Sequence, residues 1–272
     1  MLISATSALV LNWTSKEIWK SKNALEYFEA LDLSEGKTLF NMFDEVESYM
    51  HTQTVTNRKY FVRKHTIEFL NKCQNENNKG QVIILAAGIA PLSIEIASLF
   101  LESIVFDIDK YLMIEKEKYL NNICPNIKFI ECDITNIDLL NGKLIKNGWN
   151  PDKPTILIME GITYYLLEND LKFVFTFFAK KNAKLIADFV LSPECTNVKN
   201  RIFGVEVFRK IKESVGLEFV NFYDPAYFMN FIKECGFENA KRYTMDKIQF
   251  ERTGQKDPFD FVEPGWISMI KN

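Results

Sequence analysis

Residues 82–91 read Val82-Ile83-Ile84-Leu85-Ala86-Ala87-Gly88-Ile89-Ala90-Pro91. The run begins with consecutive apolar residues and shows no alternation of apolar and polar side chains. This is typical of a strand that is covered on both faces of a sheet. It ends at a turn of small residues around Gly88. Pro91 then suits the first turn of a helix, which we predict to extend to Leu101. The order strand, turn, helix predicts the first unit of an α/β domain.

The same alternation continues downstream of this unit. The apolar patterns predict further strands at 103–109, 127–134, 155–159 and 184–190, separated by helices at 110–122, 137–146 and 168–179. Strands that are joined by helices pair in parallel through right-handed crossovers. The sequence therefore predicts an α/β fold with a doubly wound, mainly parallel sheet, in which residues 79–272 form the core of a single domain.

The segments on either side of this core have a different character. Upstream, residues 1–78 are expected to form a helical cap, with predicted helices at 15–31, 40–50 and 57–73. After the fifth strand, residues 192–224 break the alternation and contain a predicted helix at 197–215, which is too long for a plain crossover. We expect this insertion to be a lid beside the ligand site. The tail is predicted as a helix at 225–235 and strands at 240–250 and 266–271.

Composition excludes several classes of protein. The chain has 272 residues, of which 47% are hydrophobic and 25% charged, as in a globular domain. A net charge of −3 argues against a nucleic-acid partner. No uninterrupted apolar stretch reaches the roughly eighteen residues of a membrane span, so no membrane association is expected. Five dispersed cysteines without a C-x-x-C pair indicate reduced thiols and a cytoplasmic location. Two histidines are too few for a His-rich metal site, and no metal is predicted.

Small or acidic residues occupy the end of each of the first four predicted strands. They are Ala86, Ala87 and Gly88 after the first strand, Asp107 and Asp109 at the second, Asp133 at the third and Glu160 at the fourth. Ligands of open α/β sheets bind outside these carboxyl ends. Asp109 lies 21 residues after Gly88 (109 − 88), the spacing of an acid that binds a ribose on the neighbouring strand. Asp107 shares its strand face and is an alternative for the same role.

The residues of this turn indicate which cofactors the site can bind. A dinucleotide fingerprint has three glycines, two of which allow the backbone to approach a pyrophosphate, whereas this turn has only Gly88. The deficit disfavours a nicotinamide dehydrogenase. It argues less against S-adenosylmethionine, which carries no phosphate but still needs an acid for its ribose and a cation for its carboxylate.

Several motifs then resemble one family. Residues 57–65 (Asn-Arg-Lys-Tyr-Phe-Val-Arg-Lys-His), 85–88, 106–109, 132–134 and 159–166 (Met-Glu-Gly-Ile-Thr-Tyr-Tyr-Leu) are similar in order and spacing to the leucine carboxyl methyltransferase family. The resemblance covers about residues 55 to 170. It implies a class I methyltransferase fold, Rossmann-like, with an N-terminal helical cap. The family includes carboxyl methyltransferases of a phosphatase subunit, a tRNA-modifying branch and bacterial natural-product O-methyltransferases.

The resemblance also implies a role for each matching residue. At the amino-acid end of S-adenosylmethionine, Arg63 would hold the carboxylate, Glu160 would lie near the amine, and the turn from Ala86 to Gly88 would face both. Asp109 would hold the ribose, and Asp133 and Ile134 would flank the adenine. Tyr165 would border the transferred methyl. Two positions depart from the family, which usually has glycine at Ala86 and glutamate at Asp107. The basic stripe around Arg63, which includes Arg58 and Lys59, is otherwise expected to be a solvated helix face.

The sequence therefore predicts an S-adenosylmethionine-dependent O-methyltransferase. Its expected acceptor is a carboxylate or hydroxyl of a small molecule, with a natural-product intermediate favoured, because the insertion is rich in aromatic residues that would enclose a pocket. These are Phe203, Phe208, Phe219, Phe222 and Tyr223. Two alternatives stay open: a non-catalytic protein that binds S-adenosylmethionine or another metabolite, and a carboxyl methyltransferase of a protein C-terminus. The sequence does not indicate an oligomeric state.

Overall fold

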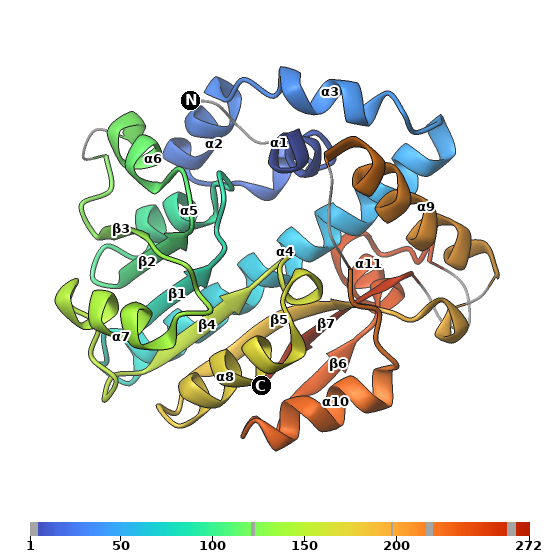
Figure 1. Cartoon of the computed structure of the whole chain (residues 1–272). Coiled ribbons are helices and arrows are strands. Elements are labelled where there is room, and N and C mark those ends of the chain that lie inside the picture. The colour runs from blue at the N-terminus through green and yellow to red at the C-terminus, as the bar shows by residue number, and fades with distance from the viewer. Residues whose placement is uncertain (1–4, 121–122, 197, 216–219, 260–264) are drawn as a thin grey trace.

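The sheet at the centre of the molecule is mostly parallel (Figure 1). The computed structural model describes residues 5–120, 123–196, 198–215, 220–259 and 265–272. Seven strands are found there, in the order β3 (Ile127–Glu131), β2 (Ile104–Asp109), β1 (Gln81–Leu85), β4 (Thr155–Met159), β5 (Lys184–Val190), β7 (Ile267–Lys271) and β6 (Lys241–Tyr243). The first five strands in this order pair in parallel, and β7 is antiparallel to both of its neighbours. The predicted doubly wound α/β fold is confirmed.

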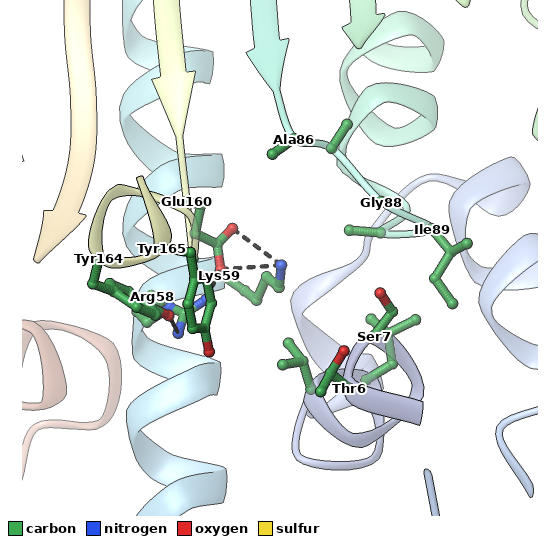
Figure 2. Close-up of a pocket in the computed structure, with 15 residues that line it drawn as sticks. Thr6, Ser7, Arg58, Lys59, Ala86, Gly88, Ile89, Glu160, Tyr164 and Tyr165 are labelled. Carbon is green, nitrogen blue, oxygen red and sulfur yellow. Dashed lines mark hydrogen bonds and ion pairs between the residues drawn. The ribbon is translucent and has the colours of Figure 1, made fainter. Parts of the chain in front are cut away.

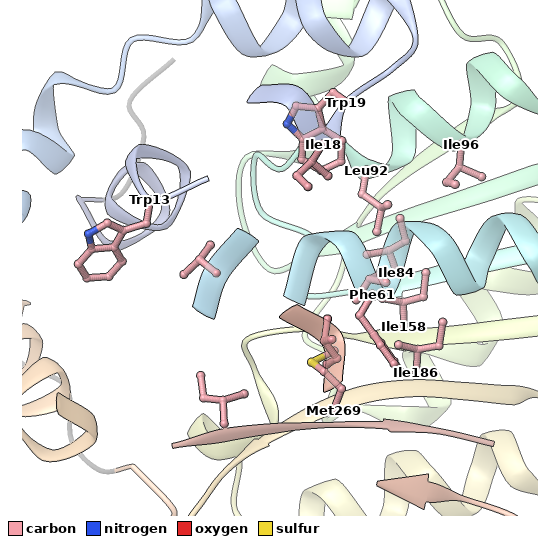
Figure 3. Close-up of a cluster of buried hydrophobic side chains, with 14 of the residues drawn as sticks. Trp13, Ile18, Trp19, Phe61, Ile84, Leu92, Ile96, Ile158, Ile186 and Met269 are labelled. Atoms are coloured by element: carbon pink, nitrogen blue, oxygen red, sulfur yellow. The ribbon is translucent and has the colours of Figure 1, made fainter. Parts of the chain in front are cut away.

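Helices cover both faces of this sheet. Successive side chains of a strand point to opposite faces, and on each face they join an apolar cluster with the helices packed there. In β1, Val82 and Ile84 join one cluster, whereas Ile83 and Leu85 join the other. The first cluster contains residues of α4 (Glu45–Asn75), α5 (Leu92–Leu99) and α11 (Met245–Thr253), and Figure 3 shows Phe61 of α4 against Ile84 and Ile158. The second contains residues of α7 (Ile137–Lys146), α8 (Glu168–Ala179) and α10 (Pro225–Glu234). α6 (Met113–Leu120) packs beside β2 and β3.

The N-terminal segment is helical, but its helices differ from those predicted. They are α1 (Ala5–Asn12), the 3-10 turn η1 (Lys16–Ile18), α2 (Lys22–Ala30), α3 (Ser34–Phe40) and α4. α4 is one helix of 31 residues where two were predicted, because no glycine or proline interrupts it and its middle is buried. Asp44 and Glu47 form a capping box at its first turn. The helix runs behind the sheet and reaches the carboxyl ends of the strands (Figure 1).

The predicted strand at 240–250 is wrong over most of its length. Only β6 is extended, and α11 follows it, beginning after Thr244 and ending at Gly254, whose φ is +78°. Met245, Ile248 and Gln249 are buried, and this three- and four-residue spacing is that of a helix. The insertion after β5 contains the turn η3 (Pro193–Cys195) and the predicted long helix, α9 (Val198–Val215). Phe219 lies outside the described residues.

Candidate functional site

A continuous crevice lies at the carboxyl ends of β1 to β4. Its narrow compartment, of about 160 Å³, lies between the turn after β1, the residues after β4, and helices α1 and α4. Figure 2 shows Thr6 and Ser7 of α1 on one side of it and Lys59 of α4 on the other. Its wide compartment, of about 450 Å³, lies beyond β2 and β3. Ser7, Ala86, Gly88, Gly161 and Tyr165 line both compartments, so the two form one site.

The turn after β1 folds tightly against the tip of β2. The backbone N–H of Gly88 donates to Asp109 Oδ2 at 2.8 Å. Ala86 and Gly88 both adopt left-handed backbone conformations, with φ of +54° and +53°. Glycine enters this region without cost, whereas an alanine there is strained by about 1–2 kcal/mol. Ala86, which departs from the family's usual glycine, is therefore held in a strained conformation at the wall of both compartments.

Acidic and apolar groups line the wide compartment. Asp109 and Asp133 border it, at the strand ends where ligands of such sheets bind, and so does Ile134, which the family resemblance had suggested. Asp133 accepts hydrogen bonds from the Thr135 hydroxyl and backbone N–H and pairs with Lys110 at 3.1 Å. These contacts, those of Thr135 above all, hold the pKa of Asp133 below its ordinary value. Asp109 accepts from the N–H of Gly88 and of Tyr111, which leaves further lone pairs on its oxygens for a ligand.

Asp107 does not share this position. Its side chain is fully buried, pairs with Lys116 at 2.8 Å and accepts from the Ser93 hydroxyl. It borders only a small void of about 20 Å³ behind the turn. The alternative that Asp107 binds a ribose is therefore not supported, because α5 and α6 cover it and Lys116 already pairs with its carboxylate.

Four charged side chains meet at the floor of the narrow compartment. Glu160, which follows β4, lies 3.1 Å from Arg58 Nη2 and 3.0 Å from Lys59 Nζ. Arg58 Nε lies 3.2 Å from Asp188 Oδ2, and Asp188 also accepts from the N–H of Gly161 at 2.8 Å. All four side chains are at most 7% exposed. The cluster has two cations and two anions, so its charges balance in a place where water cannot screen them.

Burial and neighbouring charges shift the pKa values of this cluster in opposite directions. Burial alone would raise the pKa of Glu160, but Lys59 and Arg58 overcome it and keep that pKa below its ordinary value. Burial raises the pKa of Asp188 and lowers the pKa of Lys59. A charged group bound against these buried side chains would interact strongly with them, because water screens their charges little.

The prediction for Arg63 needs a correction. Its Nε lies 2.6 Å from Glu95 Oε1, and Arg63 lines neither compartment. Glu95 is fully buried and also accepts from the backbone N–H groups of Lys20 and Ser21. Arg63 thus joins α4 to α5 and to the N-terminal segment. The cations at the narrow compartment are Arg58 and Lys59, which the sequence analysis expected to lie on a solvated helix face. They lie opposite the strand-end acid Glu160.

Two tyrosines close the other side of the narrow compartment. Tyr164 and Tyr165 lie on the turn η2 (Thr163–Tyr165), and Tyr165 borders both compartments. Burial raises the pKa of both phenols. Their rings lie 5.4 Å and 6.4 Å from the ring of Phe208 on α9. Helix α9 also packs against α1 and α3, so it lies between the N-terminal helices and these tyrosines.

Within the parts of the chain that the structure describes, no group of three or more His, Cys, Asp or Glu side chains could hold a metal ion. Over the same residues, no helix is both long and apolar enough to cross a membrane.

Comparison with known proteins assigns the chain to a family. The sequence profile of leucine carboxyl methyltransferases matches residues 14–179, which is more than half of the chain. The chain belongs to the leucine carboxyl methyltransferase family. The resemblance that was predicted from the motifs is confirmed, and this family member is an S-adenosylmethionine-dependent methyltransferase.

Solved structures support the fold of this family member. A DUF574 family protein from Streptomyces avermitilis is similar over 99% of this chain and 97% of its own, with a TM-score of 0.64 and 13% sequence identity. A candidate methyltransferase from Thermobifida fusca is similar over 95% of this chain and 94% of its own, with a TM-score of 0.60 and 13% identity. A search of curated proteins gave no match.

Proposed function

We propose that this methyltransferase transfers the methyl group of S-adenosylmethionine to a carboxylate or hydroxyl oxygen of a small molecule, for which a natural-product intermediate is the favoured source. The observation that carries the proposal is the crevice itself. It joins an acidic wide compartment to a narrow compartment that contains cations and tyrosines. Helix α1 borders both compartments, and Phe208 of α9 contacts the two tyrosines. An enclosed site suits a small acceptor better than an internal residue of a folded protein or a nucleic-acid duplex.

The described residues fit the proposed cofactor. The free lone pairs of Asp109 suit the two hydroxyls of a ribose, and Asp133 and Ile134 suit the amino group and the face of an adenine. In the narrow compartment, Lys59 and Arg58 supply cations for a carboxylate, and Glu160 supplies an acceptor for an ammonium group. The turn of small residues offers no cradle for a pyrophosphate, which argues against a dinucleotide.

The residues around the narrow compartment would mainly position and shield the reactants. Bound S-adenosylmethionine supplies a methyl group on a positively charged sulfur. The face of Tyr165 would attract such a cation by about 0.5–2 kcal/mol. Tyr164, Tyr165 and Phe208 would exclude water, and α1 and α9 would act as a lid. Holding the acceptor oxygen in line with the methyl can contribute several kcal/mol. A carboxylate acceptor needs no general base, whereas a hydroxyl is favoured by one.

Cofactor binding is tested first by calorimetry. S-adenosylmethionine and S-adenosylhomocysteine should bind, and NAD should not. Asp109→Asn removes the charged acceptor at the ribose, so it should weaken binding by roughly tenfold, as for a hydrogen bond to a charged group. Glu117→Gln removes one negative charge from an exposed position on α6 that lines neither compartment, and it serves as the control. Preferential binding of NAD would contradict the proposal.

The acceptor class is tested by labelling. The enzyme is incubated with S-adenosylmethionine that carries a deuterated methyl group and with a cell extract separated into small molecules and proteins. We expect the label in the small-molecule fraction. Mild base releases the label as methanol from a carboxyl ester but not from an ether, which distinguishes a carboxylate from a hydroxyl acceptor. Label confined to protein C-termini would overturn the small-molecule assignment, and cofactor binding without any transfer would favour a binding protein.

A further inference from the structure

The two compartments of the crevice meet at a junction, which is lined by the residues that border both of them. Among the described residues these are Ser7, Ala86, Gly88, Gly161 and Tyr165. Under the proposed function, the ribose lies beside Asp109 in the wide compartment, and the amino-acid end lies beside Lys59 and Glu160 in the narrow one. The sulfur of S-adenosylmethionine joins these two parts of the molecule. The sulfur and its methyl group therefore lie at the junction.

Of the five residues at the junction, only Ser7 and Tyr165 have a polar side chain. Ser7 belongs to α1 and Tyr165 to the turn η2, and Figure 2 shows them on opposite sides of the narrow compartment. The Ser7 hydroxyl is directed toward the turn around Gly88 (Figure 2), and a side-chain carbon placed on Gly88 would lie 3.8 Å from Ser7 Oγ. Ser7 is half-buried, so a molecule bound at the junction can contact its hydroxyl.

The packing of α1 fixes the position of Ser7. The next two residues, Ala8 and Leu9, are fully buried, and α3 passes directly against their backbone. A Cβ on Gly36 of α3 would lie 2.5 Å from backbone atoms of both residues, so a larger residue there would push the helices apart. Ala8 also belongs to an apolar cluster with Ile89, which follows the turn after β1. The hydroxyl is thus in place before a ligand binds, which lowers the entropic cost of the contact.

A hydroxyl at the junction distinguishes the two forms of the cofactor. The sulfur of S-adenosylmethionine carries a positive charge, which polarises the C–H bonds of its methyl and methylene groups, whereas the sulfur of S-adenosylhomocysteine is neutral. A hydroxyl oxygen accepts weak C–H···O hydrogen bonds from such groups. A serine hydroxyl has one donor and two lone pairs, so its oxygen can accept from a ligand even while the hydroxyl makes another hydrogen bond.

A neutral dipole suits methyl transfer better than a carboxylate would at this position. The positive charge on the sulfur disappears as the methyl leaves, so an anion held against the sulfur would stabilise S-adenosylmethionine more than the transition state. The neighbouring acids are kept apart from the junction: Asp109 lines only the wide compartment, and Glu160 lines only the narrow one. Glu160 is also paired with Arg58 and Lys59.

We infer that Ser7 recognises the charged sulfur: its hydroxyl oxygen accepts from the methyl or an adjoining methylene of S-adenosylmethionine and favours this substrate over the demethylated product. The contact weakens when the sulfur becomes neutral, so it also favours release of S-adenosylhomocysteine after transfer. The N-terminal segment thus binds the reacting group and does not only shield it. The inference rests on the proposed function, because it requires S-adenosylmethionine to span both compartments.

Calorimetry on the full chain measures the dissociation constants of both ligands for the wild type and two variants. Ser7→Ala should weaken S-adenosylmethionine binding roughly two- to fivefold, as for the loss of one weak hydrogen bond, and leave S-adenosylhomocysteine binding unchanged. Thr6→Val is the matched control, because it removes a hydroxyl from the same turn of α1 but Thr6 lines only the narrow compartment. The ratio of the two dissociation constants should keep its wild-type value in Thr6→Val. An equal loss for both ligands in Ser7→Ala, no loss for either, or the same change of ratio in Thr6→Val would overturn the inference.

A measurement on the wild type makes the test independent of the variants. The methyl of bound S-adenosylmethionine, labelled with ¹³C, should give a nuclear Overhauser effect to the β protons of Ser7 in protein in which only serine is protonated. Absence of this effect would overturn the inference. Failure of both ligands to bind the wild type would overturn the proposed function and the inference with it. Binding of both, with an unaltered ratio in Ser7→Ala, would count against the inference alone.

Discussion

Lys59→Met is the most informative change to the charge cluster. It keeps the apolar stem of the side chain and removes the ammonium that lies 3.0 Å from Glu160 Oε1. Arg58 is then left alone against the carboxylates of Glu160 and Asp188. Breaking a buried ion pair by removing one partner costs about 3–5 kcal/mol, because the other charge stays buried. We expect about 3 kcal/mol, at the lower end, since Arg58 remains 3.1 Å from Glu160.

A double-mutant cycle isolates the pair from other effects. Lys59→Met combined with Glu160→Gln leaves Arg58 opposite Asp188, so the charges balance again. The free energies of unfolding of the wild type, the two single variants and the double variant are measured by urea denaturation. We expect a coupling energy of about 2 kcal/mol, within the range found for residues in one ion-pair network.

The same helix supplies a matched control. Lys64 pairs with Glu251 at 2.5 Å, but these side chains are 33% and 43% exposed. Solvent screening should limit the coupling between Lys64→Met and Glu251→Gln to less than about 1 kcal/mol. Additive effects of the two changes at Lys59 and Glu160, or an equal coupling in both pairs, would refute the claim that burial gives the cluster its strength.

Three further outcomes are expected. Arg63→Ala should lower the free energy of unfolding by about 3–5 kcal/mol, because it leaves the buried Glu95 carboxylate without a cation, and calorimetry should show the affinity for S-adenosylhomocysteine unchanged within about twofold. Ala86→Gly should raise the thermal midpoint slightly, because it relieves about 1–2 kcal/mol of backbone strain while glycine loses about 0.5–1 kcal/mol more in entropy on folding; a lower midpoint would contradict it. Burial lowers the pKa of His51 from 6.5 in the unfolded state to about 3 in the folded state, so the unfolded state takes up a proton first as the pH falls from 6.5 toward 3. Stability should fall by up to about 1.4 kcal/mol per pH unit in that window, and His51→Phe should flatten the slope measured by urea unfolding.

The strands and crossover helices could be predicted because each satisfies its pattern locally. Strand β5, at 184–190, and helices α7 and α8, at 137–146 and 168–179, have the predicted bounds. β5 is a nearly continuous apolar run, and the apolar residues of α7 and α8 repeat at helical spacing. Prediction was wrong where the pattern was short or mixed. The residues of α11 include aromatic and β-branched side chains, and only their burial at helical spacing distinguishes them from a strand.

The members of the charge cluster could not be predicted from the sequence to the same extent. Arg58, Lys59, Arg63 and Lys64 all belong to one helix, and their spacing does not say which of them faces the strand ends. That choice depends on where α4 crosses the sheet, which is a property of tertiary packing. Glu160 was predictable, since it directly follows β4, and the carboxyl end of that strand borders the crevice. The cations opposite it required the position of a helix from outside the sheet.

Asp107 and Asp109 show how packing separates two residues that the sequence treats alike. Both lie on one face of β2, but Asp109 is at the strand tip, whereas Asp107 is under α5 and α6. Lys116 Nζ, which pairs with Asp107, also donates to the backbone carbonyls of Gly88 and Ala90 at 3.1 Å and 3.0 Å. Asp109 accepts the N–H of the same Gly88 from the other side. The two acids therefore hold one turn between them. The buried Asp107 acts through Lys116, which donates to the carbonyls of the turn, and the half-buried Asp109 accepts the N–H of Gly88 and still borders the crevice. This division explains how a turn with a single glycine and a strained Ala86 keeps one conformation at the wall of the site.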